Sequence, residues 1–275
     1  MLADGHAAVV TFNKMLKHWR SVLVTAQDVA MEAAEIRKLA ELEAKHWWYR
    51  ERRTVLVRSL DALARTGEKP GRALDIGAAG GGNTRVLRDR GWDATALEYG
   101  EEGAGVARRR NIPVIRGDAV ALPVADEAMD LVVAYDVLEH IEDDKSAAQE
   151  ITRVLRPGGT ALVAVPCDME LWSEHDTAVG HFRRYDREGL LNLLSSAGLR
   201  IEEVRSWNVL LRPVAAWRRK RCTGSDLDDL SPLVNLGLTA VIAAERYLPV
   251  GKLPGVSILV RARRDPVGVI AQTTY

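Results

Sequence analysis

The glycine-rich segment of residues 73–83 is the first segment whose residue types and spacing suggest a ligand-binding function. It reads Ala-Leu-Asp-Ile-Gly-Ala-Ala-Gly-Gly-Gly-Asn and lies directly after a linker and directly before a helical pattern. Glycines allow a sharp turn from strand to helix and let a ligand approach the backbone closely. Such a turn alone is compatible with a nicotinamide cofactor, with a flavin, or with tight packing and no ligand.

Two acidic residues follow at positions that narrow the choice. Glu98 ends a predicted strand roughly 20 residues further on, where the hydroxyls of a ribose need a hydrogen-bond acceptor. Asp118 ends the next predicted strand. Two further segments come later, Met-Asp-Leu-Val-Val-Ala-Tyr-Asp-Val-Leu-Glu-His-Ile at residues 129–141 and Val-Leu-Arg-Pro-Gly-Gly-Thr at residues 154–160.

This ordered series resembles the class I S-adenosylmethionine-dependent methyltransferase family over residues 70–206. In that family an Asp-x-Gly-x-Gly-x-Gly loop wraps the methionine part of the cofactor. The middle glycine of this pattern is replaced by Ala79. The resemblance implies S-adenosylmethionine as cofactor, with S-adenosylhomocysteine as its product. It also implies that Glu98 holds the ribose hydroxyls, that Asp118 holds the adenine amino group, and that backbone around Tyr135 flanks the cofactor.

The cofactor-binding residues predicted in this way are Asp75, Gly77, Ala79, Gly81, Asn83, Glu98, Tyr99, Asp118, Ala119 and Tyr135.

Two aromatic and basic clusters resemble signatures of one bacterial branch of the same family. They are Lys-His-Trp-Trp-Tyr-Arg-Glu-Arg-Arg at residues 45–53 and Gly-His-Phe-Arg-Arg-Tyr at residues 180–185. Aromatic walls and arginines suit an acceptor that carries a carboxylate or a phosphate. The alternative is that the tryptophans are packed caps and that the arginines pair with surface carboxylates. The predicted substrate-binding residues are Trp47, Trp48, Arg53, His181, Arg184 and Tyr185.

Two histidines are candidates for a general base, because an imidazole titrates near neutral pH. His140 follows the predicted fourth strand, and His181 lies in the second aromatic and basic cluster. A structural role that holds the loop by hydrogen bonds is the alternative for His140. No metal-ligand spacing is evident in the sequence, and no metal site is predicted.

The elements that must position these residues alternate along the chain. Apolar runs without polar alternation predict buried strands, and their alternation with helices predicts a parallel sheet built from right-handed βαβ units. The predicted strands are residues 73–76, 94–98, 113–116, 131–135, 160–165, 200–204 and 256–262. The predicted helices are residues 83–90, 102–110, 145–155 and 187–197, with two more between residues 26 and 64 that meet near residues 46–49.

The fold class expected is therefore α/β, a Rossmann-like sheet that is mostly parallel, and the resemblance implies an antiparallel final strand. Five regions are predicted: an N-terminal extension (1–25), a helical cap (26–69), the cofactor-binding core (70–206), a helical insertion (207–254), and the last strand with a tail (255–275). We expect the helical cap and the insertion to form a lid over the carboxyl ends of the strands, where ligands of open α/β sheets bind.

The composition of the 275-residue chain excludes several function classes. Lys plus Arg and Asp plus Glu number 38 each, so the formal net charge is zero and gives no support to nucleic-acid binding. Residues 218–221 (Arg-Arg-Lys-Arg) suit a solvated helix face, with a phosphate-bearing or membrane-surface partner as the alternative. Apolar stretches are too short to span a bilayer. Cys167 and Cys222 suggest no disulfide framework, and a cytoplasmic location is expected.

The function predicted is methyl transfer from S-adenosylmethionine to a small-molecule acceptor, on oxygen or nitrogen, in a bacterial natural-product, sugar or lipid-linked pathway. One alternative is a relative of the same fold that binds the cofactor without methyl transfer, as a cyclase or in a structural role. Another is a nicotinamide-dependent oxidoreductase. The acceptor and the oligomeric state are left open, a homodimer included.

Overall fold

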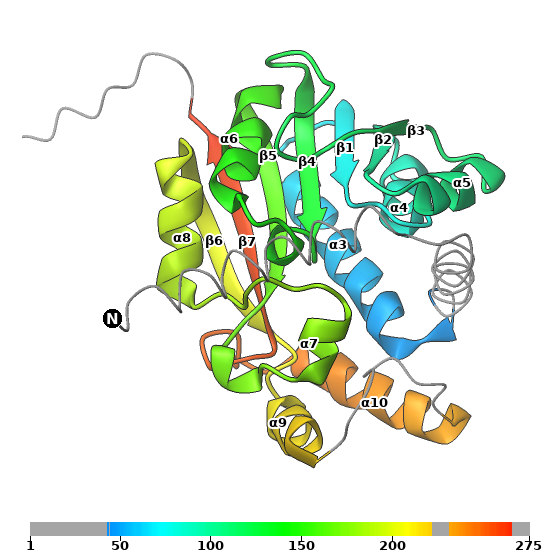
Figure 1. The fold of residues 1–275 in the computed structure, drawn as a ribbon, viewed down its shortest axis with the longest axis vertical. Coiled ribbons are helices and arrows are strands. Elements are labelled where there is room, and N and C mark those ends of the chain that lie inside the picture. Colours follow the sequence, from blue (N-terminus) through cyan, green and yellow to red (C-terminus); the bar gives the residue numbers. More distant parts are fainter. Residues whose placement is uncertain (1–42, 44, 222–230, 266–275) are drawn as a thin grey trace, which may run out of the picture. The chain divides into compact units, whose positions relative to one another are not determined.

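One seven-stranded sheet organises the chain (Figure 1). The computed structural model describes residues 43, 45–221 and 231–265. The strand order is β3-β2-β1-β4-β5-β7-β6, and every neighbouring pair is parallel except the two pairs that involve β7. The strands are β1 (Arg72–Ile76), β2 (Asp93–Glu98), β3 (Val114–Arg116), β4 (Met129–Tyr135), β5 (Leu155–Pro166), β6 (Leu199–Trp207) and β7 (Ser257–Arg264). The predicted fold class and the antiparallel final strand are confirmed.

The described helices connect these strands or follow them. They are α3 (Trp47–Arg65), α4 (Gly82–Asp89), α5 (Glu101–Arg109), α6 (Asp144–Val154), α7 (Glu174–Ala178), α8 (Arg187–Ser196), α9 (Arg212–Arg221) and α10 (Pro232–Glu245), with 3₁₀ turns η1 (Leu138–His140) and η2 (Met169–Leu171). The chain order reverses between β1 and β4, because β1 lies between β2 and β4. A crevice at the carboxyl ends of strands is expected at such a switch point.

The sheet is covered on both faces, as its continuous apolar runs require. On one face, Leu131 and Val133 of β4 pack with α3 and with Ile242 of α10. On the other face, Val132 and Ala134 pack with α6 and α8. Successive side chains of a strand point to opposite faces, so a strand of seven residues supplies both cores at once.

Helix α3 begins where the sequence indicated an interruption. His46 is its N-cap, in an extended conformation, and its imidazole accepts a hydrogen bond from the Trp48 amide. Leu56 and Leu63 pack against the sheet, so α3 forms part of a layer on the sheet face. Only its first two turns, which include Arg52, reach the residues that follow the carboxyl ends of the strands. The described part of the predicted cap is therefore mostly core, which corrects the expectation of a lid for this helix. The extension of residues 1–25 and the first predicted helix lie outside the described residues.

The predicted insertion consists of α9 and α10 in its described parts. These helices and α7 gather beyond the carboxyl ends of β4 and β5, at the bottom of Figure 1. The sequence analysis assigned Trp207 to the insertion. It is instead the last residue of β6, because its backbone still pairs with Ser257 of β7. None of the helices in the described part of the chain is long and apolar enough to cross a membrane.

Candidate functional site

The glycine-rich loop leaves β1 at the switch point of the sheet. Gly77, Ala79 and Gly81 all adopt positive φ angles, of 67°, 45° and 79°. Such angles suit glycine and strain alanine by roughly 1–2 kcal/mol, so Ala79 holds a conformation that the family pattern reserves for glycine. A side chain at Gly77 would place its Cβ 2.6 Å from Cγ2 of Val137. The loop is therefore packed closely against the segment that follows β4.

Asp75 lies beneath this loop and is 1% exposed. Its Oδ2 accepts a hydrogen bond of 2.6 Å from the Thr84 hydroxyl of α4. Burial raises the pKa of Asp75 to about 7, against the lowering effect of the Thr84 hydrogen bonds. The carboxyl group therefore ties β1 to the first turn of α4 and shapes the loop from below.

Glu98 ends β2, as predicted, with its carboxylate turned toward the loop. Its Oε2 accepts a hydrogen bond of 2.6 Å from the Ala79 amide, and its Oε1 accepts one of 3.2 Å from Gly100. An acidic side chain thus stands at the carboxyl edge beside the glycine-rich turn. This is the position from which such a group can accept hydrogen bonds from ribose hydroxyls.

A second carboxylate, that of Glu43, lies against the same loop. A side chain at Gly82 would collide with it, and a Cβ at Gly80 would lie 3.1 Å from its Oε2 and 2.5 Å from Nη1 of Arg110. Glu43 pairs with Arg110 at 2.7 Å and with Arg53 at 3.8 Å. The structure therefore places Arg53 on the side of the glycine-rich loop, where two guanidinium groups already hold a carboxylate.

The other predicted cofactor residues fall into two groups. Tyr99 and Asp118 are exposed near the carboxyl ends of β2 and β3, and Asn83 and Ala119 are partly exposed. Asp118 lies beyond β3, which ends at Arg116, and its Oδ1 accepts a hydrogen bond from the Val120 amide. The expectation that Asp118 ends the strand is wrong by two residues.

Tyr135 belongs to a different environment, because its side chain is 7% exposed in the core under α3. Burial raises its pKa to about 12. Only the backbone of Tyr135 can therefore flank a ligand at the carboxyl edge, as the sequence analysis expected.

The tryptophans of the first cluster pack around a buried arginine that the sequence analysis did not single out. The guanidinium of Arg52 lies 4.9 Å from the ring centroid of Trp48 and 4.5 Å from that of Trp207. It pairs with Asp136 and donates to Ser257 Oγ at 3.0 Å. Trp47 is 8% exposed and stacks on Trp207, as in the packed-cap alternative. Trp48, by contrast, is only half-buried.

Asp136 is the first residue after β4 and is the second residue that sequence reasoning missed. Its φ is 56°, and its carboxylate is one third exposed. A non-glycine residue in the left-handed region is uncommon and often marks a functional position. Its partner Arg52 could have been found from the sequence. Arg52 lies four positions after Trp48 on the apolar stripe of α3, where a charged residue is unusual.

The second cluster is tied to a buried carboxylate, Asp176 of α7. His181 Nδ1 and Arg184 Nη2 lie 2.8 and 2.7 Å from Asp176 Oδ1. Burial of Asp176 alone raises its pKa, but the hydrogen bonds from His181 and Arg184 outweigh burial and hold the pKa well below its usual value. Arg184 is 4% exposed. Its guanidinium group therefore contacts other protein groups, and it is too deeply buried to contact an acceptor directly.

Tyr185 is likewise part of the framework. Its hydroxyl lies 3.2 Å from the Leu138 carbonyl oxygen and 2.8 Å from Asp144 Oδ2. Phe182 also donates its amide to the Glu139 carbonyl oxygen at 2.8 Å. The cluster of residues 180–185 thus fastens the connection after β5 onto η1.

The two histidines proposed as bases lie side by side, although 41 residues separate them. The rings of His140 and His181 have centroids 4.6 Å apart in an edge-on arrangement. Burial, and then the neighbouring His181, lower the pKa of His140 to about 4. Next to them is Glu139, 1% exposed, whose pKa burial and the charge of Asp136 raise well above its usual value.

The comparisons with known proteins agree with this geometry. Residues 74–163 match the family described as a methyltransferase domain. A probable S-adenosylmethionine-dependent methyltransferase of Mycolicibacterium smegmatis is 29% identical over 172 residues, which are 61% of this chain and 65% of the relative. The demethylmenaquinone methyltransferase of Renibacterium salmoninarum is 40% identical over 101 residues, 36% of this chain and 43% of the relative.

The chain thus spans less than two thirds of the length of these relatives. Among solved structures, an S-adenosylmethionine-dependent methyltransferase of Thermotoga maritima, described as a possible histamine N-methyltransferase, superposes with a TM-score of 0.55. The match covers 84% of this chain and 98% of the other, at 20% identity, and shows the fold alone. By sequence match and by fold, the chain is similar to S-adenosylmethionine-dependent methyltransferases: residues 74–163 match the methyltransferase domain, and the sheet shares the fold of the Thermotoga maritima structure.

Proposed function

We propose that the chain transfers the methyl group of S-adenosylmethionine to a small-molecule acceptor, on oxygen or nitrogen. The observation that carries this proposal is the carboxylate of Glu98 beside the positive-φ loop, at the switch point of the sheet. The family match over the same residues supports it. The proposed cofactor site consists of Gly77, Ala79, Gly81, Asn83, Glu98, Tyr99, Asp118, Ala119 and the backbone of Tyr135, with Asp75 shaping the loop from below.

The methionine carboxylate of the cofactor would be held by Arg53 and Arg110 in this proposal. The support is that these two guanidinium groups already hold the carboxylate of Glu43 against Gly80 and Gly82. A ligand carboxylate with the same charge fits the same place. The cofactor supplies the methyl group, and the chain's own residues position it for an in-line displacement.

We place the acceptor between the first turn of α3 and the connection of residues 167–185, with α9 and α10 as the covering helices. Trp48, Arg52 and Asp136 supply an aromatic wall with charged groups at its base. His181, held by Asp176, faces the same region together with His140. Partly buried aromatic and charged side chains of this kind suit a small molecule better than a nucleic acid or a flat protein surface. The alternative of cofactor binding without methyl transfer has no observation in its favour.

Calorimetric titration tests the cofactor directly. The purified chain is titrated with S-adenosylmethionine, with S-adenosylhomocysteine and with a nicotinamide dinucleotide as control. We expect saturable micromolar binding of the two sulfur compounds alone. Glu98→Ala should weaken that binding roughly 10- to 100-fold, because it removes charge-assisted hydrogen bonds worth about 1.5–3 kcal/mol. The control is Glu101→Ala, which removes a neighbouring exposed carboxylate and should leave the binding unchanged. Binding of the dinucleotide instead would overturn the proposal.

Methyl transfer itself is tested with S-adenosylmethionine that carries a labelled methyl group, mixed with a bacterial small-molecule extract. We expect the label in the dialysable fraction, together with S-adenosylhomocysteine. Label recovered in protein or nucleic acid would contradict the small-molecule acceptor. Cofactor that binds and stays intact with every extract would favour the non-transferring alternative.

A further inference from the structure

Three side chains bring metal-ligating atoms together beyond the carboxyl end of β4. One nitrogen from each of His140 and His181 and one carboxylate oxygen of Glu139 all lie within 4.8 Å of one another. In residues 45–221 and 231–265, no other group of three or more His, Cys, Asp or Glu side chains is placed to hold a metal ion. The sequence analysis named His140 and His181 as candidate bases but predicted no metal site, because η1 supplies two members of this group and the distant connection after β5 supplies the third.

Glu139 is the member that points most directly to a ligand. It is 1% exposed, and neither carboxylate oxygen finds a hydrogen-bond partner among the described residues. A buried carboxylate with no partner costs several kcal/mol of folding free energy, so native proteins pair such groups or use them to coordinate metals. Arg52 is close enough to act on it through its charge, but no hydrogen bond joins the two side chains.

His181 is already oriented as a metal ligand requires. Its Nδ1 lies 2.8 Å from Oδ1 of Asp176, which is fully buried and held by Arg184. An ionised carboxylate only accepts hydrogen bonds, so Nδ1 carries the proton and Nε2 keeps its lone pair. Histidines that bind metals almost always donate their other ring nitrogen in this way, and the carboxylate fixes both tautomer and ring orientation.

We propose that Glu139, His140 and His181 bind a divalent transition-metal ion of the zinc class, with Asp176 orienting His181. Two imidazole nitrogens and one carboxylate oxygen match zinc sites that keep a fourth position open, whereas magnesium and calcium prefer oxygen ligands throughout. Zinc–ligand bonds of about 2.0–2.2 Å place ligand atoms about 3.4 Å apart. The three side chains therefore close by about 1 Å on binding, which the short turn η1 and the partly exposed His140 allow.

The position of this site gives the metal a use that rests on the proposed function. Val137, two residues before Glu139, packs against Gly77 of the cofactor loop. A metal ion at such a place lowers the pKa of a coordinated hydroxyl, and a deprotonated oxygen is the form that accepts a methyl group. The site therefore favours a hydroxyl-bearing acceptor.

Metal binding is measured on the full chain without any acceptor. The protein is stripped with a chelator, dialysed, and titrated calorimetrically with zinc chloride and, separately, with magnesium chloride. We expect one zinc ion per chain at micromolar affinity or tighter, and magnesium at least 100-fold weaker. Glu139→Gln and His181→Gln should each weaken zinc binding at least tenfold. Asp176→Asn should weaken it 10- to 100-fold, as loss of an orienting carboxylate does.

Glu142→Gln is the matched control, because it neutralises an exposed carboxylate three residues from Glu139 and should leave zinc binding unchanged. Glu139→Gln keeps the shape of the side chain and removes an unpartnered buried carboxyl group, so this variant should fold, as circular dichroism will verify. Zinc binding that persists in folded Glu139→Gln and His181→Gln would overturn the site, as would a wild-type chain that binds no zinc.

The cofactor titration separates this inference from the proposed function. Folded Glu139→Gln that loses zinc but binds S-adenosylmethionine as the wild type does supports a distinct metal site. A wild-type chain that binds zinc through these residues but does not bind S-adenosylmethionine would keep the metal site and remove the methyl-transfer proposal.

Discussion

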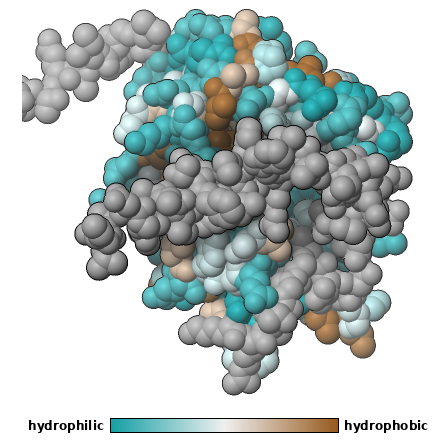
Figure 2. Space-filling model, viewed as in Figure 1, coloured by the Kyte–Doolittle hydropathy of each residue, from teal (hydrophilic) through white to brown (hydrophobic). Residues whose placement is uncertain are grey.

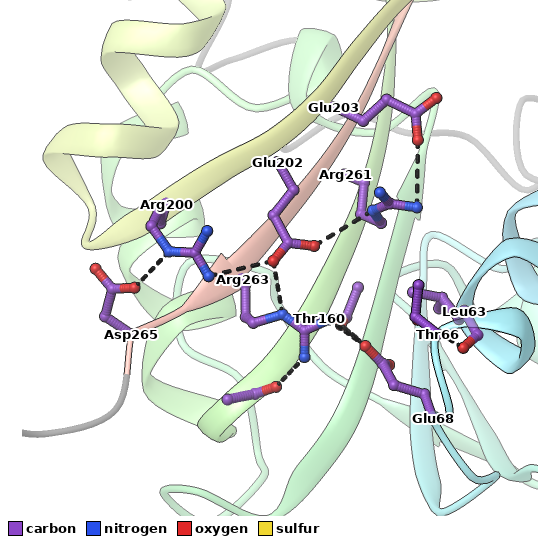
Figure 3. A network of polar contacts seen from close by, with 11 residues as sticks. Leu63, Thr66, Glu68, Thr160, Arg200, Glu202, Glu203, Arg261, Arg263 and Asp265 are labelled. Carbon is purple, nitrogen blue, oxygen red and sulfur yellow. Dashed lines mark hydrogen bonds and ion pairs between the residues drawn. The ribbon is translucent and has the colours of Figure 1, made fainter.

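Charged side chains form two networks in this protein, and they differ in how completely their members are paired. The edge network joins β6 and β7 to Glu68, which follows α3, and to Asp265, which follows β7; its other members are Arg200, Glu202, Glu203, Arg261 and Arg263 (Figure 3). The site network lies beyond the carboxyl ends of β4 and β5 and consists of Arg52, Asp136, Glu139, Asp176, His181 and Arg184.

Every member of the edge network has an oppositely charged neighbour. Oε1 of Glu202, for example, lies 3.2 Å from Arg200 and 2.8 Å from Arg263. The pairing register shifts between Ile201 and Glu203, and this irregularity lets both Glu202 and Glu203 contact Arg261. Many charges on an edge strand also discourage pairing with other chains.

The site network is more deeply buried and less complete. Asp176 and Arg184 satisfy each other, but Nε and Nη1 of Arg52 and both oxygens of Glu139 have no hydrogen-bond partner among the described residues. In the edge network the corresponding atom is Nε of Arg261, which lies 3.3 Å from a Glu202 oxygen. Unpaired buried groups are costly and persist where they serve a function. The degree of pairing, rather than the number of charges, therefore distinguishes the structural network from the site.

A third surface, on α10, carries little charge. Large apolar side chains are exposed on this helix, and the brown surface at the lower right of Figure 2 lies over its end. Leu233 and Leu236 are the most exposed of these side chains. Glu245, which is buried, is the one ionisable residue of α10, and this surface belongs to neither network.

The largest expected effect concerns the buried carboxyl group below the site, that of Asp75. Its pKa of about 7 lies above the unfolded value of 3.8, so the folded state retains its proton between these values while the unfolded state loses it. The unfolding free energy therefore falls as pH rises from 4 to 7, by up to about 4 kcal/mol. Asp75→Asn should abolish that fall. Urea denaturation at several pH values measures it, with exposed Asp89→Asn as control.

Arg184→Met comes next, because it leaves the fully buried Asp176 without its closest guanidinium partner. Removing one partner of a buried pair typically costs 3–5 kcal/mol, and we expect about 3 kcal/mol because His181 and Arg219 stay near Asp176. Chemical denaturation measures the loss. Arg263→Met in the edge network is the matched variant, and an equal loss there would break the comparison.

A double-mutant cycle on Arg52 and Asp136 compares the pair energies of the two networks directly. Arg52 is almost fully buried and Asp136 one third exposed, so we expect a coupling energy of about 1–2 kcal/mol in unfolding experiments with Arg52→Met, Asp136→Asn and the double variant. The same cycle on Glu202 and Arg263 should give less than about 0.5 kcal/mol. Equal coupling in the two pairs would show that burial does not distinguish the networks.

The smallest effect is expected for Glu202→Gln, below about 1 kcal/mol. Burial raises the pKa of Glu202, but hydrogen bonding to Arg263 and the nearby positive charges outweigh burial and lower it. A lowered pKa contributes stability above the unfolded value that is lost as pH falls. The variant should therefore be less stable than the wild type at pH 7, and the difference should shrink as the pH falls through the lowered pKa of Glu202. High salt should also remove the difference. The sign is opposite to that for Asp75, which thermal unfolding at two pH values will check.

The sequence predicted the sheet well, because the sheet depends on local patterns. The apolar runs of the strands and the positive-φ loop are encoded by neighbouring residues, and Glu98 is the last residue of its strand, as predicted. The cofactor site itself stays a prediction. The acceptor side was predicted only in part. Trp48, Arg53 and His181 were named from a resemblance, whereas Arg52, Asp136, Glu139 and Asp176 were missed.

Hydrophobic periodicity and glycine positions act over short stretches of chain, so they were enough to predict the strand and helix order, the mostly parallel sheet, and the glycine-rich turn at its carboxyl edge. Only the tertiary structure decided which charges face each other. It brought His181 to His140, Arg52 to Asp136, and Arg184 to a buried carboxylate. Such pairs depend on how distant segments fold back together, and their cost or benefit depends on a burial that no local pattern specifies.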